Sequence, residues 1–215
     1  MSTVVLDRTE TLADLLDRLG GIPLNRIRMQ PAPGTATEHD LLDPQYGDSR
    51  LCELVDGVVV EKGVGYYESR LAAVLIWYLE SFLRRRRLGI VVGADAHTRF
   101  RPGLVRMPDV AFVRKERLPK GKVPRTAIAS LPPDLAVEIM SRSNTEREMN
   151  RKRREYFEAG VRLVWQVYPR RKVVRVYSGV DEFVELGEGD TLDGGDVLPG
   201  FSLSISEWFE RADEP

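Results

Sequence analysis

Two acidic residues lie in stretches of the chain that are otherwise mostly apolar. Asp109 lies within residues 107–113, and Glu138 lies within residues 135–140. Ionised carboxylates are rarely buried unless an ion pair, hydrogen bonds or a bound cation compensate their charge. For either acid alone, a salt bridge to one of the many arginines or a position at a strand end is a sufficient explanation.

A metal ion would explain both acids together. Two carboxylates on neighbouring strands of one sheet form an oxygen-rich site that suits Mg²⁺ or Mn²⁺. The chain has one cysteine, Cys52, and its two histidines, His39 and His97, are far apart in sequence. These counts exclude an internal disulfide framework and a thiolate zinc cluster, so that any metal must be held by oxygen ligands.

Lys152 is the third residue that could take part in this chemistry. It lies four residues before Tyr156, beside the apolar stripe of a predicted helix, and from there its side chain can reach toward Glu138. The simpler alternative is an exposed ion pair with Glu148, worth only a few tenths of a kcal/mol. Arg153 is about as close to the apolar stripe, and periodicity does not choose between the two cations.

Glu68 is a further acid on a predicted buried face. It lies three residues before Leu71, on the apolar stripe of the longest predicted helix. A carboxylate at a helix start commonly interacts with the positive end of the helix, which is the preferred interpretation of Glu68 taken alone. The alternative is a ligand that turns toward a site.

The basic residues are unevenly distributed, although the net charge is only −1. Runs of basic residues occupy positions 84–87, 151–154 and 170–172, whereas the chain from residue 181 onward is strongly acidic. Each run alone is typical of a solvated helix face or turn. Together they favour a surface that contacts phosphate groups, with Arg151, Arg153 and Arg154 as candidates for salt-dependent contacts to a nucleic-acid backbone.

The length of 215 residues predicts one domain with an N-terminal extension. Residues 1–50 are expected to form an N-terminal helix and an irregular arm, and residues 51–210 the main domain. No apolar run approaches the ~20 residues of a membrane helix, and the N-terminus lacks the pattern of a signal peptide. We therefore expect a soluble, cytoplasmic protein.

Periodicity and turn residues predict an alternation of strands and helices. Helices are expected over residues 9–19, 66–87, from a cap at Asn144 to Gly160, and over 204–210, where Trp208 and Phe209 would dock. Strands are expected over residues 51–55, 58–61, 89–100, 107–113, 135–140, 162–168, 172–177 and 183–186, with a tight turn at Asp56-Gly57 and a loop over 30–49. This order predicts an α/β protein whose sheet carries helices on both sides.

The residues singled out above resemble a known superfamily. Pro108-Asp109, Glu138-Ile139-Met140, Lys152 and Tyr156 resemble the pattern of the PD-(D/E)XK nucleases. More narrowly, the chain from residue 51 to 209 resembles the bacterial Uma-type restriction endonuclease family. That resemblance rests on Leu54-Val55-Asp56-Gly57, residues 133–138, Ser141, residues 152–156, Gly160-Val161 and Val164-Trp165.

The resemblance implies a restriction-endonuclease-like fold, in which helices flank a central mixed β-sheet. It also implies that Asp109 and Glu138 are ligands of Mg²⁺ or Mn²⁺, with Glu68 as the supporting acid. The superfamily's usual lysine position holds Met140, and the family resemblance assigns the amine to Lys152 on the following helix. The family usually has Asp before Pro169, where this chain has Tyr168, and we expect that position to tune a turn.

The leading hypothesis is a Mg²⁺-dependent endonuclease that hydrolyses phosphodiester bonds of nucleic acid, with DNA as the favoured substrate. The alternative is a catalytically weak nucleic-acid-binding or assembly module of the same fold, because resemblance establishes a fold more firmly than a reaction. A third, weaker hypothesis is a structural oligomerisation domain whose acids pair with arginines. Cutting both strands of a duplex would make a symmetric homodimer reasonable.

Overall fold

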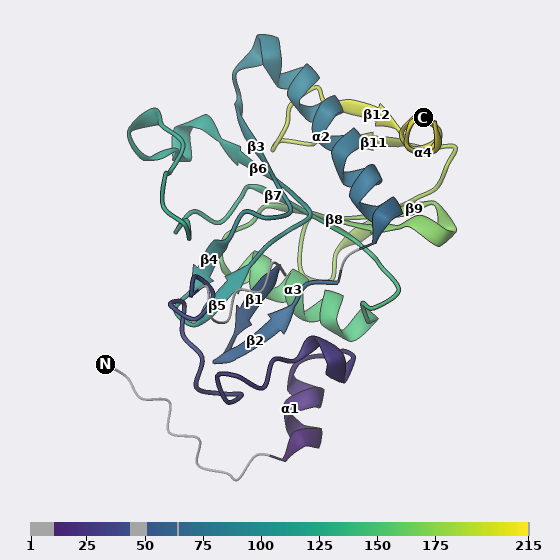
Figure 1. The fold of residues 1–215 in the computed structure, drawn as a ribbon. Helices are drawn as coiled ribbons and strands as arrows, with labels where there is room; N and C mark the ends of the chain where they lie inside the picture. Colours follow the sequence, from purple (N-terminus) through teal and green to yellow (C-terminus); the bar gives the residue numbers. More distant parts are fainter. Residues whose placement is uncertain (1–10, 44–50, 64, 215) are drawn as a thin grey trace.

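The computed structural model describes residues 11–43, 51–63 and 65–214. It contains a six-stranded sheet with helices on both faces and a four-stranded sheet beside it (Figure 1). None of the helices in the described part of the chain is long and apolar enough to span a membrane.

The six-stranded sheet is mixed, as predicted. Only β7 and β8 pair in parallel, and the other neighbouring strands are antiparallel. From one edge to the other its strands are β10 (Phe183–Leu186), β9 (Val173–Tyr177), β8 (Leu163–Tyr168), β7 (Leu135–Ile139), β6 (Val110–Arg114) and β3 (Gly89–Gly93). The two central strands, β7 and β8, are buried along their whole length.

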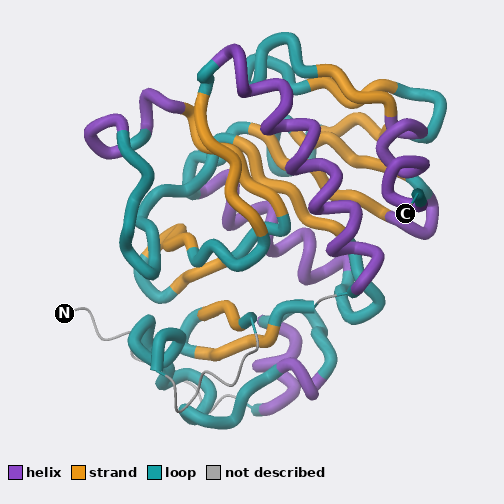
Figure 2. The backbone as a smooth tube through the Cα atoms, turned by 45° about the horizontal axis from the view of Figure 1, so that its top comes forward, coloured by secondary structure: helices purple, strands orange, loops and turns teal. Residues whose placement is uncertain are grey.

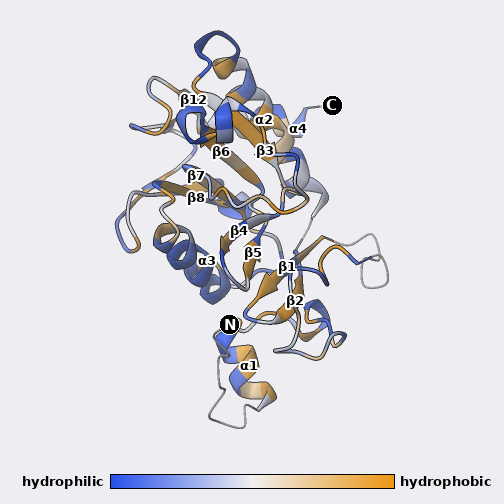
Figure 3. Ribbon diagram, turned by 90° about the vertical axis from the view of Figure 1, so that its left-hand side faces the viewer, coloured by the Kyte–Doolittle hydropathy of each residue, from blue (hydrophilic) through white to orange (hydrophobic). Residues whose placement is uncertain are grey.

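Helices cover the two faces of this sheet. On one face α2 (Tyr66–Arg86) and α4 (Ile205–Asp213) enclose the main apolar core, in which Trp208 and Phe209 are fully buried. On the other face α3 (Glu146–Glu158) packs Tyr156 against Ala136 of β7. Figure 3 shows α3 on the opposite side of β7 and β8 from α2 and α4. The predicted layers and the docking of the last helix are confirmed.

The four-stranded sheet has the order β2 (Val58–Glu61), β1 (Cys52–Val55), β5 (Leu104–Arg106) and β4 (Thr98–Arg101). The predicted hairpin is confirmed, because Asp56 and Gly57 form the turn of β1 and β2 with φ angles of 49° and 79°. Positive φ at both central residues is the geometry that matches the twist of a two-residue hairpin.

The N-terminal segment packs against this smaller sheet (Figure 2). The helix α1 (Leu12–Arg18) places Leu15 in a core shared with Val58 of the hairpin and Tyr156 of α3. At its end Gly20 has a φ of 84° and lies so close to α3 that a Cβ there would come within 2.7 Å of the Glu148 backbone nitrogen. The domain boundary expected at residue 50 stays a prediction, as does the part of the 30–49 loop that falls within residues 44–50, outside the described residues.

Two predicted strands were wrong in extent. The strand predicted over residues 89–100 is two strands, β3 and β4, which lie in different sheets, and the strand predicted over residues 107–113 begins only at Val110 of β6. The short strand β5 of the smaller sheet, which precedes this second stretch, was not predicted. Pro108 interrupts the second stretch, since proline has no backbone N–H for a sheet hydrogen bond. Asp109 therefore lies just before β6 rather than inside a strand.

The cap predicted for α3 was also wrong by one residue. Thr145 is the N-cap, and its hydroxyl accepts a 3.0 Å hydrogen bond from the Glu148 backbone N–H. Asn144 instead accepts from the Ser141 backbone N–H at 3.0 Å. Both residue types make good caps, so the sequence alone favoured the wrong neighbour.

The remaining elements are short. The small sheet of β11 (Thr191–Asp193) and β12 (Ser202–Ser204) was not predicted, because three-residue strands carry almost no periodicity. Single 3₁₀ turns are η1 (Leu24–Arg26), η2 (Lys115–Arg117), η3 (Pro119–Gly121) and η4 (Pro169–Arg171).

Candidate active site

Asp109 and Glu138 lie side by side where β6 and β7 pair. The Asp109 backbone N–H donates to the Val137 carbonyl at 2.9 Å, and the Ile139 backbone N–H donates to Asp109 Oδ2 at 2.6 Å. The Asp109 carboxylate is thus fixed on the backbone of the residue that follows Glu138. The structure therefore brings together the two acids that the sequence singled out.

Lys152, and not Arg153, faces these acids. The buried Lys152 Nζ lies 3.0 Å from Glu138 Oε2. Arg153 points toward β9 instead, where its guanidinium lies 4.2 Å from the centre of the Tyr177 ring and donates to the Val180 carbonyl at 2.5 Å. The choice that periodicity left open is settled by the aromatic side chain on β9.

Glu53 is a third acid of the cluster, fully buried, which the sequence did not single out. Its Oε1 lies 3.1 Å from Lys152 Nζ and accepts from the Met107 backbone N–H at 3.0 Å, and its Oε2 lies 2.7 Å from Arg106 Nη1. Arg106 in turn donates to Glu155 at 2.7 Å and 2.9 Å. Glu53 had the same signal as the other two acids, since it lies within the otherwise apolar strand β1.

Lys62 is the second lysine of the cluster, and no sequence signal pointed to it. Its side chain is 3% exposed, and its Nζ lies 2.8 Å from Asp109 Oδ1 and 3.2 Å from the Ala94 carbonyl. A lysine just after a strand is usually solvated, so its burial here follows only from contacts with residues far along the chain, Ala94 and Asp109.

Every oxygen of the Asp109 and Glu138 carboxylates has a partner. Asp109 pairs with Lys62 and accepts a hydrogen bond from the Ile139 backbone N–H. Glu138 pairs with Lys152 and accepts a hydrogen bond from the buried hydroxyl of Tyr156. The carboxylates are held in one orientation by donors from β7, from α3 and from Lys62, the residue after β2.

The cluster strongly perturbs the acidity of its members. Burial raises the pKa of Glu138, with Asp109 raising it further and Lys152 opposing both. Burial alone would also raise the pKa of Glu53, but Lys152 and Arg106 hold it far below its usual range. Burial would lower the pKa of Lys152, yet Glu138 and Glu53 raise it above its usual value. Glu53 therefore stays a carboxylate and Lys152 an ammonium, while at Glu138 the effect of burial on the pKa outweighs that of the nearby cations.

Glu68 is placed in the first turn of α2, partly buried, with its carboxylate folded over the N-cap residue Gly65. No hydrogen bond or ion pair joins it to Asp109 or Glu138 within the described ranges. Among the same residues, no group of three or more His, Cys, Asp or Glu side chains converges as a metal cage. The role of Glu68 as a supporting acid stays a prediction.

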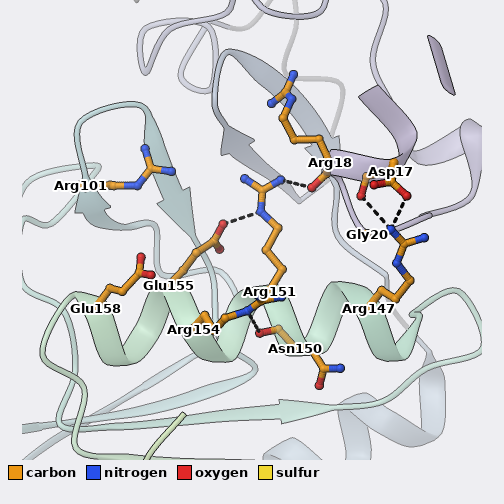
Figure 4. Close-up of a pocket in the computed structure, with 10 residues that line it drawn as sticks. All are labelled: Asp17, Arg18, Gly20, Arg101, Arg147, Asn150, Arg151, Arg154, Glu155 and Glu158. Carbon is orange, nitrogen blue, oxygen red and sulfur yellow. Dashed lines mark hydrogen bonds and ion pairs between the residues drawn. The ribbon is translucent and has the colours of Figure 1, made fainter. Parts of the chain in front are cut away.

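The arginines of α3 have different surroundings. Arg151 and Arg154 line a pocket of about 380 Å³ between α3 and α1, and Figure 4 shows Arg151 reaching to Glu155 and to the Arg18 carbonyl. Arg151 also bonds Asp56 at 2.5 Å. Arg154 is exposed, and its only hydrogen bond to a described residue is to the Asn150 carbonyl one turn earlier, at 3.3 Å. With Arg153 buried, Arg154 has the most accessible guanidinium of the three, and their contacts to nucleic acid stay predictions.

By its fold, the chain is an α/β protein whose central mixed sheet carries helices on both faces, and a solved structure shares this fold. The crystal structure of a putative nuclease of family DUF820 from Anabaena variabilis matches with a TM-score of 0.67 at 17% sequence identity, covering 75% of this chain and 90% of that chain. The chain itself belongs to the Uma2 family of putative restriction endonucleases, whose family model matches residues 39–206. No curated protein matches the sequence. The family identified from the motifs is thereby confirmed, and the matched region contains Glu53, Asp109, Glu138 and Lys152.

Proposed function

We propose that the chain is a divalent-metal-dependent endonuclease of the PD-(D/E)XK type, which hydrolyses phosphodiester bonds of DNA with Mg²⁺ or Mn²⁺ as its cofactor. Membership of the family supports a nuclease in general. The observation that carries the finer proposal is one contact: Lys152, a buried cation, lies 3.0 Å from Glu138 in the same cluster as Asp109. Two acids and an amine in one cluster are the groups that such a hydrolysis requires.

The residues fit a hard divalent ion. Asp109 and Glu138 offer only oxygen donors, which Mg²⁺ and Mn²⁺ prefer. The Asp109 side chain is 16% exposed, so that an ion and a phosphate can approach it from solvent. Each carboxylate oxygen has two acceptor positions, so the present hydrogen bonds do not exhaust them. Asp109 and Glu138 would hold the ion, and Glu68 would join them only if its side chain turned away from Gly65.

A bound Mg²⁺ polarises a phosphoryl oxygen and lowers the pKa of a coordinated water. The protein's own contribution is orientation and charge. Lys152 uses two of its three N–H donors on Glu138 and Glu53, and the third can donate to the attacking water or to a phosphate oxygen. Because its pKa is raised, Lys152 stays charged and acts as a donor and a counter-charge rather than as a base.

The test is cleavage of plasmid and single-stranded DNA by the wild-type chain, Asp109→Asn and Lys152→Met, each with Mg²⁺ or Mn²⁺. We expect both variants to lose at least ~100-fold in rate, as removal of one transition-state contact does in other enzymes. Thermal melting checks that the variants fold, and the partly exposed Asp109→Asn is the safer of the two. Equal cleavage by all three proteins would overturn the assignment.

Calorimetric titration with Mn²⁺ separates this proposal from the alternative of a catalytically weak binding or assembly module. Metal binding that depends on Asp109, together with cleavage, supports the nuclease. Metal binding or nucleic-acid binding without cleavage favours the module. The homodimer expected for double-strand cutting is tested independently by sedimentation.

A further inference from the structure

A second basic site lies at the carboxyl ends of the two central strands. There the segment after β7 and the turn η4 after β8 enclose a pocket of about 280 Å³, whose lining includes Met140, Arg142, Tyr168, Arg170 and Arg171. The parallel register of β7 and β8, in which Ile139 pairs with Val167, places these two segments next to each other. The pocket is distinct from the one between α3 and α1.

The charged side chains that line this pocket are all basic. Three arginines line it and no acidic residue does. Arg142 and Arg170 are exposed, and neither makes a side-chain hydrogen bond or ion pair with any residue that the structure describes. Arg171 is partly neutralised, because it bonds Glu185 at 2.9 Å. The pocket between α3 and α1 differs, because its lining includes the acids Asp17, Glu155 and Glu158. Its Arg151 guanidinium is bonded to two carboxylates, Glu155 and Asp56.

The Tyr168 side chain, which lines the pocket, is held in place by hydrogen bonds. Tyr168 is buried, and its hydroxyl donates to Glu146 at 3.1 Å and accepts from Arg175 at 3.0 Å. The ring therefore forms a fixed, uncharged floor between the two free arginines and the core of the sheet. The Glu146 carboxylate that the hydroxyl contacts is not among the residues that line the pocket.

The pocket is close to the cluster of acids. Met140 follows β7 directly, and Glu138 lies two residues earlier in the same strand. At ~3.3 Å per residue the two positions are about 7 Å apart along the strand. One nucleic-acid strand whose phosphate lies at Asp109 and Glu138 can thus present a neighbouring phosphate to the pocket.

We propose that this pocket binds a backbone phosphate next to the bond that is cleaved, with Arg142 and Arg170 as its donors. This inference rests on the proposed nuclease function, since it takes the substrate strand to lie across Asp109 and Glu138. Arginine binds phosphate through paired N–H groups, and contacts to phosphate fix the register of the strand without reading its bases. Arg142 and Arg170 are positioning residues.

The experiment compares the double variant Arg142→Ala/Arg170→Ala with the matched control Arg162→Ala. Arg162 is an exposed arginine at the opposite end of the β8 strand. Binding of a labelled oligonucleotide is measured in EDTA over a series of salt concentrations.

We expect the double variant to lose about tenfold in affinity. The slope of log K against log salt should fall by ~0.7 on a single strand or ~0.9 on a duplex for one lost phosphate contact. Arg142→Lys/Arg170→Lys should recover part of the affinity, and Arg162→Ala should match the wild-type chain.

The outcomes separate this inference from the proposed function. Mn²⁺ binding by the double variant should equal that of the wild-type chain, because neither arginine contacts the acids. If the wild-type chain cleaves DNA but the double variant binds it no worse than Arg162→Ala does, the pocket is not a phosphate site and the nuclease assignment stands. If the chain neither binds metal nor cleaves, the nuclease assignment fails, and the EDTA binding series still decides the pocket. No nucleic-acid binding by the wild-type chain overturns both.

Discussion

Glu53 and Lys152, which are 99 residues apart in the chain, form a buried ion pair of 3.1 Å. The pair joins β1 of the smaller sheet to α3, which covers the larger one. Because Lys152 also bonds Glu138 of β7, a single ammonium group ties both sheets and the helix together. The placement of the proposed catalytic amine therefore depends on the packing of the two sheets, not on α3 alone.

The first prediction concerns this shared ammonium group. Glu53→Gln leaves Lys152 and Arg106 each without one buried counter-charge, and breaking a buried ion pair from one side costs about 3 to 5 kcal/mol. We expect the free energy of unfolding, measured with urea, to fall by that amount and cleavage to fall with it. Glu116→Gln, at an exposed acid, is the control. An unchanged stability of Glu53→Gln would show that the pair is not formed in solution.

The second prediction concerns Lys62 as a competitor for the metal. Its ammonium lies 2.8 Å from Asp109 Oδ1, on a carboxylate that is proposed to hold the ion. A unit charge ~4 Å away is worth about 4 kcal/mol at an effective dielectric of 20, so its removal should tighten Mn²⁺ binding by at least about tenfold. Lys62→Met should therefore bind Mn²⁺ more tightly in calorimetry and melt at a lower temperature without metal. Exposed Lys122→Met is the control, and an affinity unchanged or weakened by Lys62→Met contradicts the competition.

The acids and the amine show what the sequence could and could not predict. Asp109 and Glu138 were detectable because an acid among apolar residues conflicts with the local pattern, and Glu53 carried the same conflict within β1. Lys62 carried none, since a basic residue after a strand is ordinary. Lys152 and Arg153 were equivalent on the helix, and only the distant ring of Tyr177 separated them. Such contacts depend on packing between segments far apart in the chain.

The same limit applies to the fold. The hairpin turn, the long helix and a sheet with helices on both sides followed from turn residues and periodicity, which are local. The mixed pairing of the sheet followed from the family resemblance. The passage of the chain from one sheet to the other at Met107-Pro108-Asp109 was missed, because residues 107–113 are mostly apolar and resemble one strand, and because the three-residue strand β5 before them carries almost no periodicity. That passage places Asp109 beside Glu138, so the step that was hardest to predict is the one that builds the site.

The third prediction concerns acid stability and the buried pair of Arg26 and Glu148, which are 2.7 Å apart. Burial alone would raise the pKa of Glu148, but Arg26 and Lys152 hold it below its usual value of 4.5. A folded-state pKa below the unfolded value contributes stability that is present above the unfolded pKa and lost as the pH falls through the folded one. The wild-type free energy of unfolding should therefore decline more steeply below pH 4.5 than that of Glu148→Gln.

Urea titrations in steps from neutral pH down to the acid limit of folding provide the measurement, with Glu116→Gln expected to follow the wild-type chain. Parallel declines for the wild-type chain and Glu148→Gln would show that Glu148 does not contribute to the acid sensitivity.

The fourth prediction concerns the hydroxyl of Tyr156, which donates to Glu138 Oε1. A hydrogen bond to a carboxylate favours its charged form, so Tyr156→Phe should raise the pKa of Glu138 further above its usual value. Protons then compete with the metal up to a higher pH. The pH below which Mn²⁺ affinity falls, measured by calorimetry across pH, should therefore be higher in the variant. The variant should also lose about 1 to 3 kcal/mol of stability, because the Glu138 oxygen is left without its donor.

The control Tyr66→Phe, at a tyrosine that is 96% exposed, should leave both the pH dependence of Mn²⁺ affinity and the stability unchanged. A pH dependence of Mn²⁺ affinity that stays in place in Tyr156→Phe, while stability falls, would mean that Tyr156 supports the fold without tuning the metal-binding acid.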